Sequence, residues 1–310
     1  MSASAIVTFA VLVIVAVILV REHRREARPR GSLQAAATSH TEPELADSEV
    51  EKILNSFDAQ LEAHRLDYIN LRPVAALAPS PWNSKFGGKA YWPRTARYPE
   101  AENGHKLYLL AQLNFSELPA LPGYPERGLL QFFITDDDLM GLSFADSSGK
   151  QAELRKNPGN FRVVYHEEIL EDPGALETEV PDTGEAEYFP LSAEYALKAE
   201  RKSGLPSSTD YRFEQTGIDL TAMPDQVMDA LWERNDAAGS RIGGYATFTQ
   251  DDPRYGQPQD AWLLLFQMDT SYEDTVDIMW GDCGVGNFFI QPDALAKRDF
   301  SRVWYNWDCC

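Results

Sequence analysis

The sequence predicts an α+β fold that is internally duplicated. Each unit is expected to be a helix followed by several strands of an antiparallel or mixed sheet, and the two units are expected to be related by pseudo-twofold symmetry. One N-terminal transmembrane helix is predicted to precede them. Three observations support this fold class: an internal repeat, two segments with helical spacing of apolar residues, and a long apolar run at the amino terminus.

The amino terminus has the pattern of a membrane anchor. Residues 3–20 are apolar except for Ser4 and Thr8, and a helix of that length covers about 27 Å, close to the roughly 30 Å core of a bilayer. Five arginines follow between Arg21 and Arg30, and no basic side chain precedes the run. The positive-inside rule therefore predicts a single-pass inner-membrane protein whose C-terminal domain faces the cytoplasm. The alternative, a cleaved secretory signal, lacks its basic start and its cleavage site.

The rest of the chain divides by composition. Residues 1–20 are the predicted anchor, and residues 21–43 are a basic flank followed by a small, polar segment typical of a flexible linker. Residues 44–310 are expected to form one domain, with repeat one at about 44–170 and repeat two at about 220–310.

The repeat is visible in short motifs that recur in the same order. GLLQFFI from Gly128 aligns without a gap with GVGNFFI from Gly284, and SKFGG from Ser84 matches SRIGG from Ser240. Matches that keep their order and nearly their spacing indicate an internal duplication. They establish organisation and specify no reaction.

Each unit is expected to begin with an amphipathic helix. Apolar residues recur at helical spacing in residues 44–71 and again in residues 221–236, where Pro224 stands at the start. Aromatic and branched runs bounded by Gly, Pro or Asp predict strands at residues 107–115, 129–135, 161–167, 262–269, 287–290 and 303–307. Residues 188–200 are ambiguous between strand and helix, and their alternation favours a strand.

The charge excludes one class of partner. The chain has a net charge of −20, and removing the five arginines and two glutamates of residues 1–30 leaves −23. Nucleic acid repels such a surface, so the expected partners are the lipid bilayer, through the N-terminal helix, and a protein or a small molecule. The three cysteines form no disulfide framework and fit a reducing compartment.

Polar residues inside the repeated strands suggest a ligand-binding cleft. A glutamine interrupts an apolar strand in each copy, and the residue two positions later lies on the same face. We expect a shared cleft between the units, lined by Gln112, Asn114, Gln267 and Asp269, with Arg97 and Arg254 nearby. The competing interpretation is that each glutamine bonds to backbone at a strand end, as most buried polar side chains do, and that the arginines pair with surface carboxylates.

Catalysis has one weak candidate. The string GDCG around Cys283 resembles the nucleophile loop of chymotrypsin-like proteases and of their viral cysteine variants, with His105 and His166 preceding it in the required order. Neither histidine lies in a recognisable histidine motif. The sequence has no HExxH, no paired CxxC, no Walker loop and no dinucleotide fingerprint, so we expect no metal and no cofactor.

The motifs also carry a resemblance to a known family. They are SKFGG at Ser84, LAQLN at Leu110, GLLQFF at Gly128, GGYATFTQ at Gly243, GDCGVGNFFI at Gly281 and DFS at Asp299. Together they resemble the YwqG-like family of uncharacterised bacterial proteins, which implies a duplicated α+β domain from about Glu51 to the end. The expected function is a membrane-tethered cytoplasmic binding or interaction module. The alternative is a hydrolase using Cys283 or the glutamine and aspartate residues of the cleft.

Overall fold

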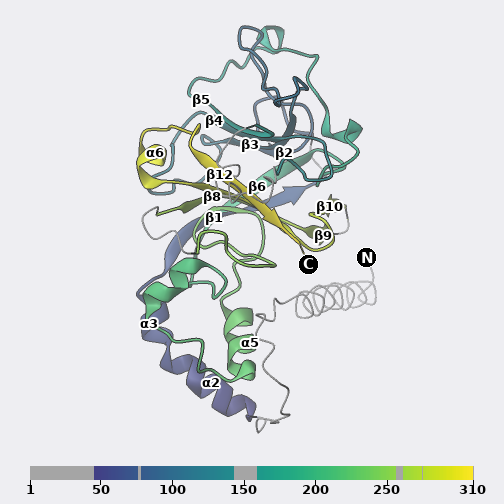
Figure 1. Cartoon of the computed structure of the whole chain (residues 1–310). Helices are drawn as coiled ribbons and strands as arrows, with labels where there is room; N and C mark the ends of the chain where they lie inside the picture. Colours follow the sequence, from purple (N-terminus) through teal and green to yellow (C-terminus); the bar gives the residue numbers. More distant parts are fainter. Residues whose placement is uncertain (1–44, 76–77, 143–158, 256–260, 274, 310) are drawn as a thin grey trace, which may run out of the picture.

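A computed structural model describes residues 45–75, 78–142, 159–255, 261–273 and 275–309 (Figure 1). Its α-helices are α2 (Asp47–Ser56), α3 (Asp58–Glu62), α5 (Asp225–Arg234) and α6 (Pro292–Ala296), and its 3₁₀ helices are η1 (Pro173–Ala175), η2 (Thr183–Glu185) and η3 (Tyr211–Thr216). Its strands are β1 (Leu66–Val74), β2 (Lys85–Phe86), β3 (Tyr108–Asn114), β4 (Leu129–Ile134), β5 (Phe161–His166), β6 (Tyr195–Gly204), β7 (Arg241–Gly243), β8 (Leu263–Asp269), β9 (Ser271–Glu273), β10 (Val276–Ile278), β11 (Val285–Ile290) and β12 (Val303–Asp308).

Ten of these strands form one antiparallel sheet. Its order is β12-β11-β8-β7-β1-β6-β2-β3-β4-β5, and β9 and β10 form a separate hairpin. The long pair β1 and β6 lies in the middle, with Leu66 opposite Gly204 and Val74 opposite Ala196. The first half of the sheet is therefore β2 to β5 and the second half is β7, β8, β11 and β12.

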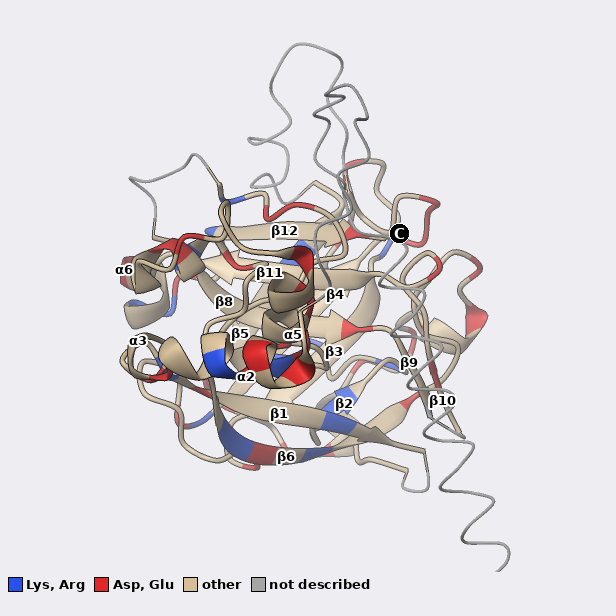
Figure 2. Ribbon diagram, turned by 90° about the horizontal axis from the view of Figure 1, so that it is seen from below, with Lys and Arg blue, Asp and Glu red and all other residues tan. Residues whose placement is uncertain are grey.

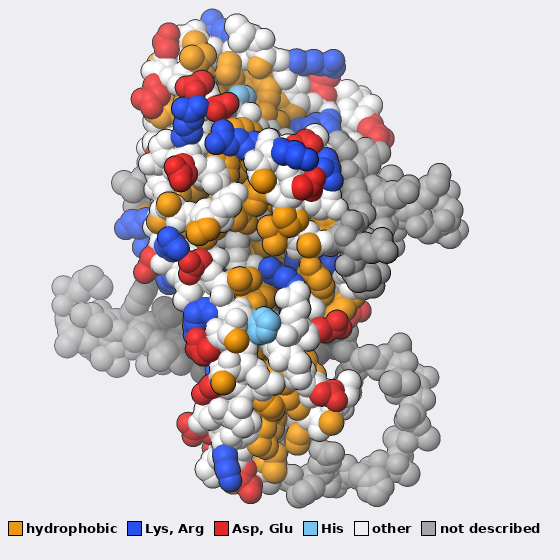
Figure 3. Space-filling view, turned by 90° about the vertical axis from the view of Figure 1, so that its left-hand side faces the viewer, with side chains coloured by type: hydrophobic (Ala, Val, Ile, Leu, Met, Phe, Trp, Pro, Cys, Tyr) orange, Lys and Arg blue, Asp and Glu red, His pale blue; other side chains and the backbone are white. Residues whose placement is uncertain are grey.

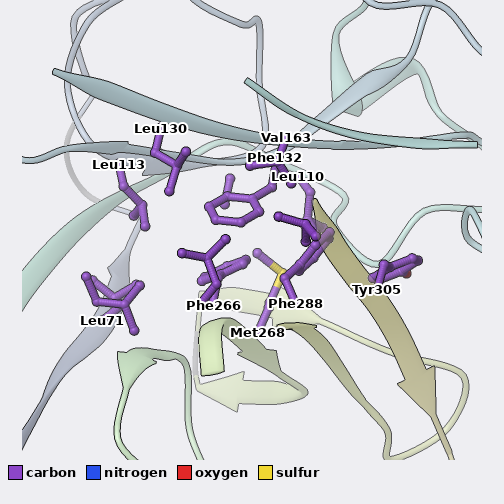
Figure 4. Close-up of a cluster of buried hydrophobic side chains, with 14 of the residues drawn as sticks. Leu71, Leu110, Leu113, Leu130, Phe132, Val163, Phe266, Met268, Phe288 and Tyr305 are labelled. Atoms are coloured by element: carbon purple, nitrogen blue, oxygen red, sulfur yellow. The ribbon is translucent and has the colours of Figure 1, made fainter. Parts of the chain in front are cut away.

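The sheet curls until its two halves pack face to face. The ring of Phe132 on β4 lies 4.6 Å from that of Phe266 on β8 and 4.9 Å from that of Phe288 on β11. Phe161 and Tyr305, on the outermost strands β5 and β12, are 5.4 Å apart. The main hydrophobic core thus fills the space inside a nearly closed sheet (Figure 4).

The outer face of the curved sheet is also covered. Along β4, Leu130, Phe132 and Ile134 join the inner core, whereas Phe133 belongs to a second cluster with Trp92 on the other side. This alternation is the two-residue period of a strand. Loops therefore bury the outer face, and every residue of β4 is buried.

The helices α2, α3 and α5 form a lobe at one end of the molecule (Figure 1). Leu54 and Leu61 pack with Val227 and Leu231 in a separate hydrophobic cluster. Figure 3 shows hydrophobic side chains along the part of its face that carries this lobe. The helices of the two predicted units hence pack on each other rather than on their own strands.

The predicted α+β architecture is wrong. The structure is mostly one large antiparallel sheet with few helices, and it is not a pair of helix-plus-sheet units related by a twofold axis. The reason is strand pairing: β6, which lies outside both predicted repeats, hydrogen-bonds β1 on one side and β2 on the other. A strand edge left unpaired is unfavourable, so the two halves join into one sheet.

Most predicted elements are nevertheless present. The six predicted strand segments correspond to β3, β4, β5, β8, β11 and β12, and the ambiguous segment ends in β6. Residues 44–71 are helical only as far as Glu62, because Leu66–Val74 belong to β1. Within the described residues no helix has the length and apolarity needed to span a bilayer. The predicted anchor, residues 3–20, lies outside the described residues.

Candidate functional site

The two predicted glutamines lie on the outer face of the sheet. Gln112 on β3 and Gln267 on β8 are fully buried. Their neighbours Leu113 and Met268 point into the inner core, so the glutamines point the opposite way. The aromatic core lies between them, and each glutamine contacts the loop that covers its own half of the sheet.

Both glutamines are held by backbone groups in the same way. The backbone N–H of Tyr91 donates to Gln112 Oε1 at 3.0 Å, and Gln112 Nε2 donates to the carbonyls of Pro81 and Asn83 at 2.8 Å. In the second half, the N–H of Thr247 donates to Gln267 Oε1 at 2.9 Å, and Gln267 Nε2 donates to the carbonyls of Ala237 and Gly239 at 2.8 Å. The competing interpretation, in which glutamine bonds to backbone, is confirmed.

The next predicted pair behaves similarly. Asn114 Nδ2 donates to the carbonyl of Trp82 at 3.0 Å, and Asp269 Oδ2 accepts from the N–H of Gly239 at 2.6 Å. Both side chains fix the segment that enters β2 or β7. These side-chain atoms already bond to the protein. Ligand binding by these residues stays a prediction.

The two predicted arginines lie in opposite environments. Arg97 is 83% exposed and pairs with Glu100 at 2.6 Å. Arg254 is fully buried and pairs with Asp252 at 2.7 Å and with Asp210 at 2.9 Å. The structure therefore does not bring these arginines together, and only Arg97 is a surface ion pair as the competing interpretation expected.

Arg254 belongs to a buried ionic cluster made of Asp210, Arg212, Asp252 and Arg254. Arg212 bonds Asp210 through two nitrogens, at 2.9 and 2.7 Å, and the guanidinium of Arg254 stacks 4.3 Å from the ring of Phe289. Burial alone would raise the pKa of Asp210, but Arg212 and Arg254 hold that pKa well below its usual value. The cluster carries two charges of each sign and is internally neutralised, which favours a structural role.

The glutamines also belong to rows of buried polar side chains on neighbouring strands. In register, the rows are Lys85, Gln112 and Gln131 in the first half and Arg241, Gln267 and Asn287 in the second. Lys85 Nζ donates to the carbonyl of Lys89 and to Glu194 Oε1, each at 2.7 Å. Both rows lie under the segments that follow the two Gly-Gly pairs.

Those glycine pairs have a structural reason. Gly88 and Gly244 both have φ of +69°, a conformation that side chains rarely adopt. A Cβ on Gly244 would lie 2.9 Å from the Cβ of Tyr68. The glycines therefore let the chain turn tightly from β2 or β7 onto the outer face of the sheet.

The row of the first half ends at His166 on β5. Gln131 Nε2 donates to the carbonyl of Tyr91 and to Gln112 Oε1, so its oxygen faces His166 Nε2 at 2.9 Å. His166 Nε2 must then carry the proton of this bond. Burial lowers the pKa of His166 to about 4, so the ring is neutral at pH 7.

The catalytic alternative is not favoured at Cys283. This residue is buried and disulfide-bonded, whereas nucleophilic attack requires a free thiolate. The sequence predicted no disulfide framework, and the disulfide bond of Cys283 departs from that expectation. Cys309 is a free cysteine, and burial raises the pKa of its thiol.

The structure also has exposed apolar side chains that the sequence did not predict, in the segment of Tyr188 and in the region of the β9–β10 hairpin. Tyr188, Tyr272 and Met279 are 51%, 46% and 40% exposed. Met279 N–H donates to the carbonyl of Pro190 at 2.9 Å, which places the end of the β9–β10 hairpin beside the segment of Tyr188. The only sequence signal was the high density of Asp and Glu around these residues, and density alone does not place them together.

This surface is negatively charged. Exposed carboxylates surround it: Asp138, Glu187, Asp277 and Asp282, together with the partly buried Asp136. Glu187 is the largest cause that raises the pKa of Tyr188, and Asp138 and Asp136 raise it further. Burial raises the pKa of Tyr272, and Asp277 and Asp282 add to the effect. Figure 2 shows several acidic segments on the side of the molecule that carries β9 and β10.

Comparison with known proteins gives a family whose description names no function. No curated protein matches the chain. Residues 84–309 match the family described as a domain of unknown function (DUF1963). This match covers more than half of the chain, and the chain therefore belongs to that family.

Proposed function

We propose that this chain is a protein-binding module that recognises a basic segment of its partner through the acidic aromatic face. This face is defined by Tyr188, Tyr272 and Met279 and by the carboxylates around them. The observation that carries the proposal is the exposure of three large apolar side chains together with the carboxylates that raise the pKa values of Tyr188 and Tyr272. Single exposed apolar residues are ordinary, but a group of them supports an interaction site.

The face is continuous because its segments are bonded to one another. Asp136 Oδ1 accepts the N–H of Tyr188 at 2.6 Å, which ties the loop after β4 to the segment before β6. Leu191 pairs with Ile278 next to Met279. Tyr272 stands opposite Asp277 in the β9–β10 hairpin. The three apolar side chains thus lie on fixed backbone.

The charges select the partner. Every charged group that shifts the pKa of Tyr108, Tyr188 or Tyr272 is an Asp or a Glu, and all of them raise it. A lysine or arginine of a partner would gain from this potential and could also lie over a tyrosine ring as a cation–π contact. Tyrosine is also enriched among the residues that dominate binding energy. A basic, partly apolar protein segment is the complementary partner.

Binding of defined peptides to the full-length protein tests the proposal. We expect a twelve-residue peptide rich in arginine and leucine to bind, and binding to weaken at least tenfold in Tyr188→Ala and at higher salt. The matched control is Tyr255→Ala, since Tyr255 is 47% exposed but lies outside this face. Fluorescence anisotropy would measure the affinities, and thermal melts would show that the fold is intact. Equal binding by a peptide with glutamates in place of the arginines, or by Tyr188→Ala, contradicts the proposal.

We also propose that residues 3–20 attach the chain to the lipid bilayer, with the domain on the cytoplasmic side. The support is the apolar run and the arginines that follow it. The disulfide at Cys283 points the other way, because disulfides are rare in reducing compartments. A membrane-impermeant maleimide decides between the sides: Cys309 in intact cells should stay unlabelled, and its labelling would contradict the cytoplasmic side. The finer assignment to YwqG-like proteins within this family is likewise a proposal, supported by the motifs of the sequence.

A further inference from the structure

The two middle strands of the sheet have basic side chains on their outer face. Ile69 and Leu71 on β1 belong to the inner core. The two-residue period of a strand therefore places Arg72 on the outer face, together with its partner Lys198 on β6. Lys202, four residues further along β6, lies on the same face. All three basic side chains are exposed, and Figure 2 shows basic positions on both strands.

Two of these cations face each other. Arg72 and Lys198 are directly opposite in the register of β1 and β6, so their Cβ atoms lie about 5 Å apart. On this face Lys202 pairs with Glu200 at 3.2 Å, and among the described residues no ion pair involves Arg72 or Lys198. Like charges directly opposite each other destabilise a sheet. An anionic group bound between the two side chains would replace this repulsion by attraction.

The general features of the protein do not account for this pair. The chain has 48 acidic and only 28 basic side chains, so two adjacent cations run against its composition. Lysine is common on edge strands, where it prevents pairing with other chains, but β1 and β6 are the fifth and sixth of the ten strands in the sheet. A cationic surface on an anionic protein attracts an acidic partner and fixes its orientation.

The charges along β6 specify a spacing in the partner. On the outer face Lys198, Glu200 and Lys202 alternate in sign, and each is about 7 Å from the next because a strand rises about 3.4 Å per residue. An extended peptide has the same two-residue period. The complementary segment therefore has an acidic residue, a basic or neutral residue and an acidic residue at every second position. A carboxylate at the middle position would lie near Glu200 and be repelled.

We propose that Arg72, Lys198 and Lys202 bind an acidic, extended segment of a partner protein. Guanidinium and ammonium groups pair with carboxylates, and an arginine can hold one carboxylate through two parallel hydrogen bonds. Nucleic acid and anionic lipid present dense negative charge, which the net charge of −20 repels. A short segment with two spaced carboxylates meets only the local cations. This surface uses other strands than the acidic aromatic face and recognises the opposite charge.

Fluorescence anisotropy with the full-length protein and labelled twelve-residue peptides at low salt tests this surface. We expect binding of a peptide with glutamate at positions i and i+4 and lysine at i+2, and binding about threefold weaker when all three positions are glutamate. Lys198→Glu should weaken binding of the first peptide by about tenfold or more. The matched control is Lys52→Glu, which makes the same charge change at an exposed position of α2 and should weaken binding by less than about twofold.

Thermal melts without peptide give an independent measurement. Lys198→Glu places a carboxylate opposite Arg72, so we expect the melting temperature to rise by about 1–4 °C. Arg72→Gln also removes the repulsion, and we expect it to raise the melting temperature less and to weaken binding of the first peptide. A lower melting temperature in both variants would contradict the proposal.

The binding data can overturn the proposal in three ways: no binding of the first peptide by the wild type, equal binding by Lys198→Glu, or an equal loss of binding in Lys52→Glu. Stronger binding of the peptide with three glutamates would also overturn it, because the partner would then not follow the charges of β6. Tyr188→Ala should bind the first peptide as the wild type does. The result for this surface is therefore independent of the result for the acidic aromatic face.

Discussion

The two halves of the sheet share one hydrogen-bonding scheme and differ at its end. In each half a glutamine bonds to two backbone segments: the one that precedes β2 or β7, and the one that follows the Gly-Gly turn. The first half ends in a neutral histidine that donates to Gln131. The second ends in Asp308, a buried carboxyl whose Oδ2 accepts the backbone N–H groups of Thr249 and Gln250. The shared part holds the covering segments in place, and the differing part is where a specific property can reside.

The largest expected effect concerns the arginines at matching places in the repeat. Arg254→Ala leaves Asp210 and Asp252 buried with less positive charge, so we expect the free energy of unfolding to fall by about 3–5 kcal/mol. Arg97→Ala removes an exposed ion pair and should change it by less than about 1 kcal/mol. Urea denaturation of both variants measures the difference. Equal losses would show that the two positions are energetically equivalent despite their different burial.

The next largest effect is the loss of stability on replacing either glutamine. Gln112→Ala and Gln267→Ala each remove the partner of three buried backbone groups, and we expect each to cost roughly 2–4 kcal/mol of stability. The exposed Gln250→Ala, whose side chain bonds only the carbonyl of Cys309 in the described structure, is the control and should cost about 0.5 kcal/mol. A stable Gln112→Ala protein that has lost a bound small molecule would instead restore the ligand-binding prediction for this residue.

The smallest expected effect is the pH dependence of stability in the wild type, because the contributions of Asp308 and His166 have opposite signs and nearly cancel. Between about pH 4 and 6 the unfolded chain has Asp308 ionised and His166 protonated. The folded chain has Asp308 protonated and His166 neutral, because burial raises the pKa of Asp308 to about 6 and lowers that of His166 to about 4. Asp308 therefore makes stability fall as pH rises through this window, and His166 makes it rise.

Variants separate these two contributions. Asp308→Asn should become more stable by roughly 2 kcal/mol from pH 4 to 6 relative to wild type, since only the His166 contribution remains. His166→Gln should show the opposite slope of similar size. Denaturation at several pH values measures both, and each wild-type curve is the control for the carboxylates common to all three proteins. Slopes of the same sign would contradict the assigned burial of one of the two groups.

The candidate sites were predictable only in part. The period of the apolar residues indicated that Gln112 and Gln267 are buried and that each shares a strand face with the residue two positions later. It could not indicate that these faces lie on the outside of a curled sheet, because curvature depends on how all ten strands pair. The sequence likewise could not indicate that Arg97 is exposed and Arg254 is buried, because both arginines precede a tyrosine that follows a Gly-Gly turn.

The local features of this protein were predictable from its sequence: the positions of the main strands, the Gly-Gly turns and the recurrence of one motif in two places. These follow from contacts between residues close in the chain and from the two-residue period of a strand. The tertiary structure was needed to show that β6 joins both halves into one sheet and that the segment after Tyr188 lies beside the end of β10. It also placed Asp308 opposite β11, where His166 stands opposite β4. Such pairings join residues as distant in the chain as Tyr68 and Gly243, and no local pattern in the chain records them.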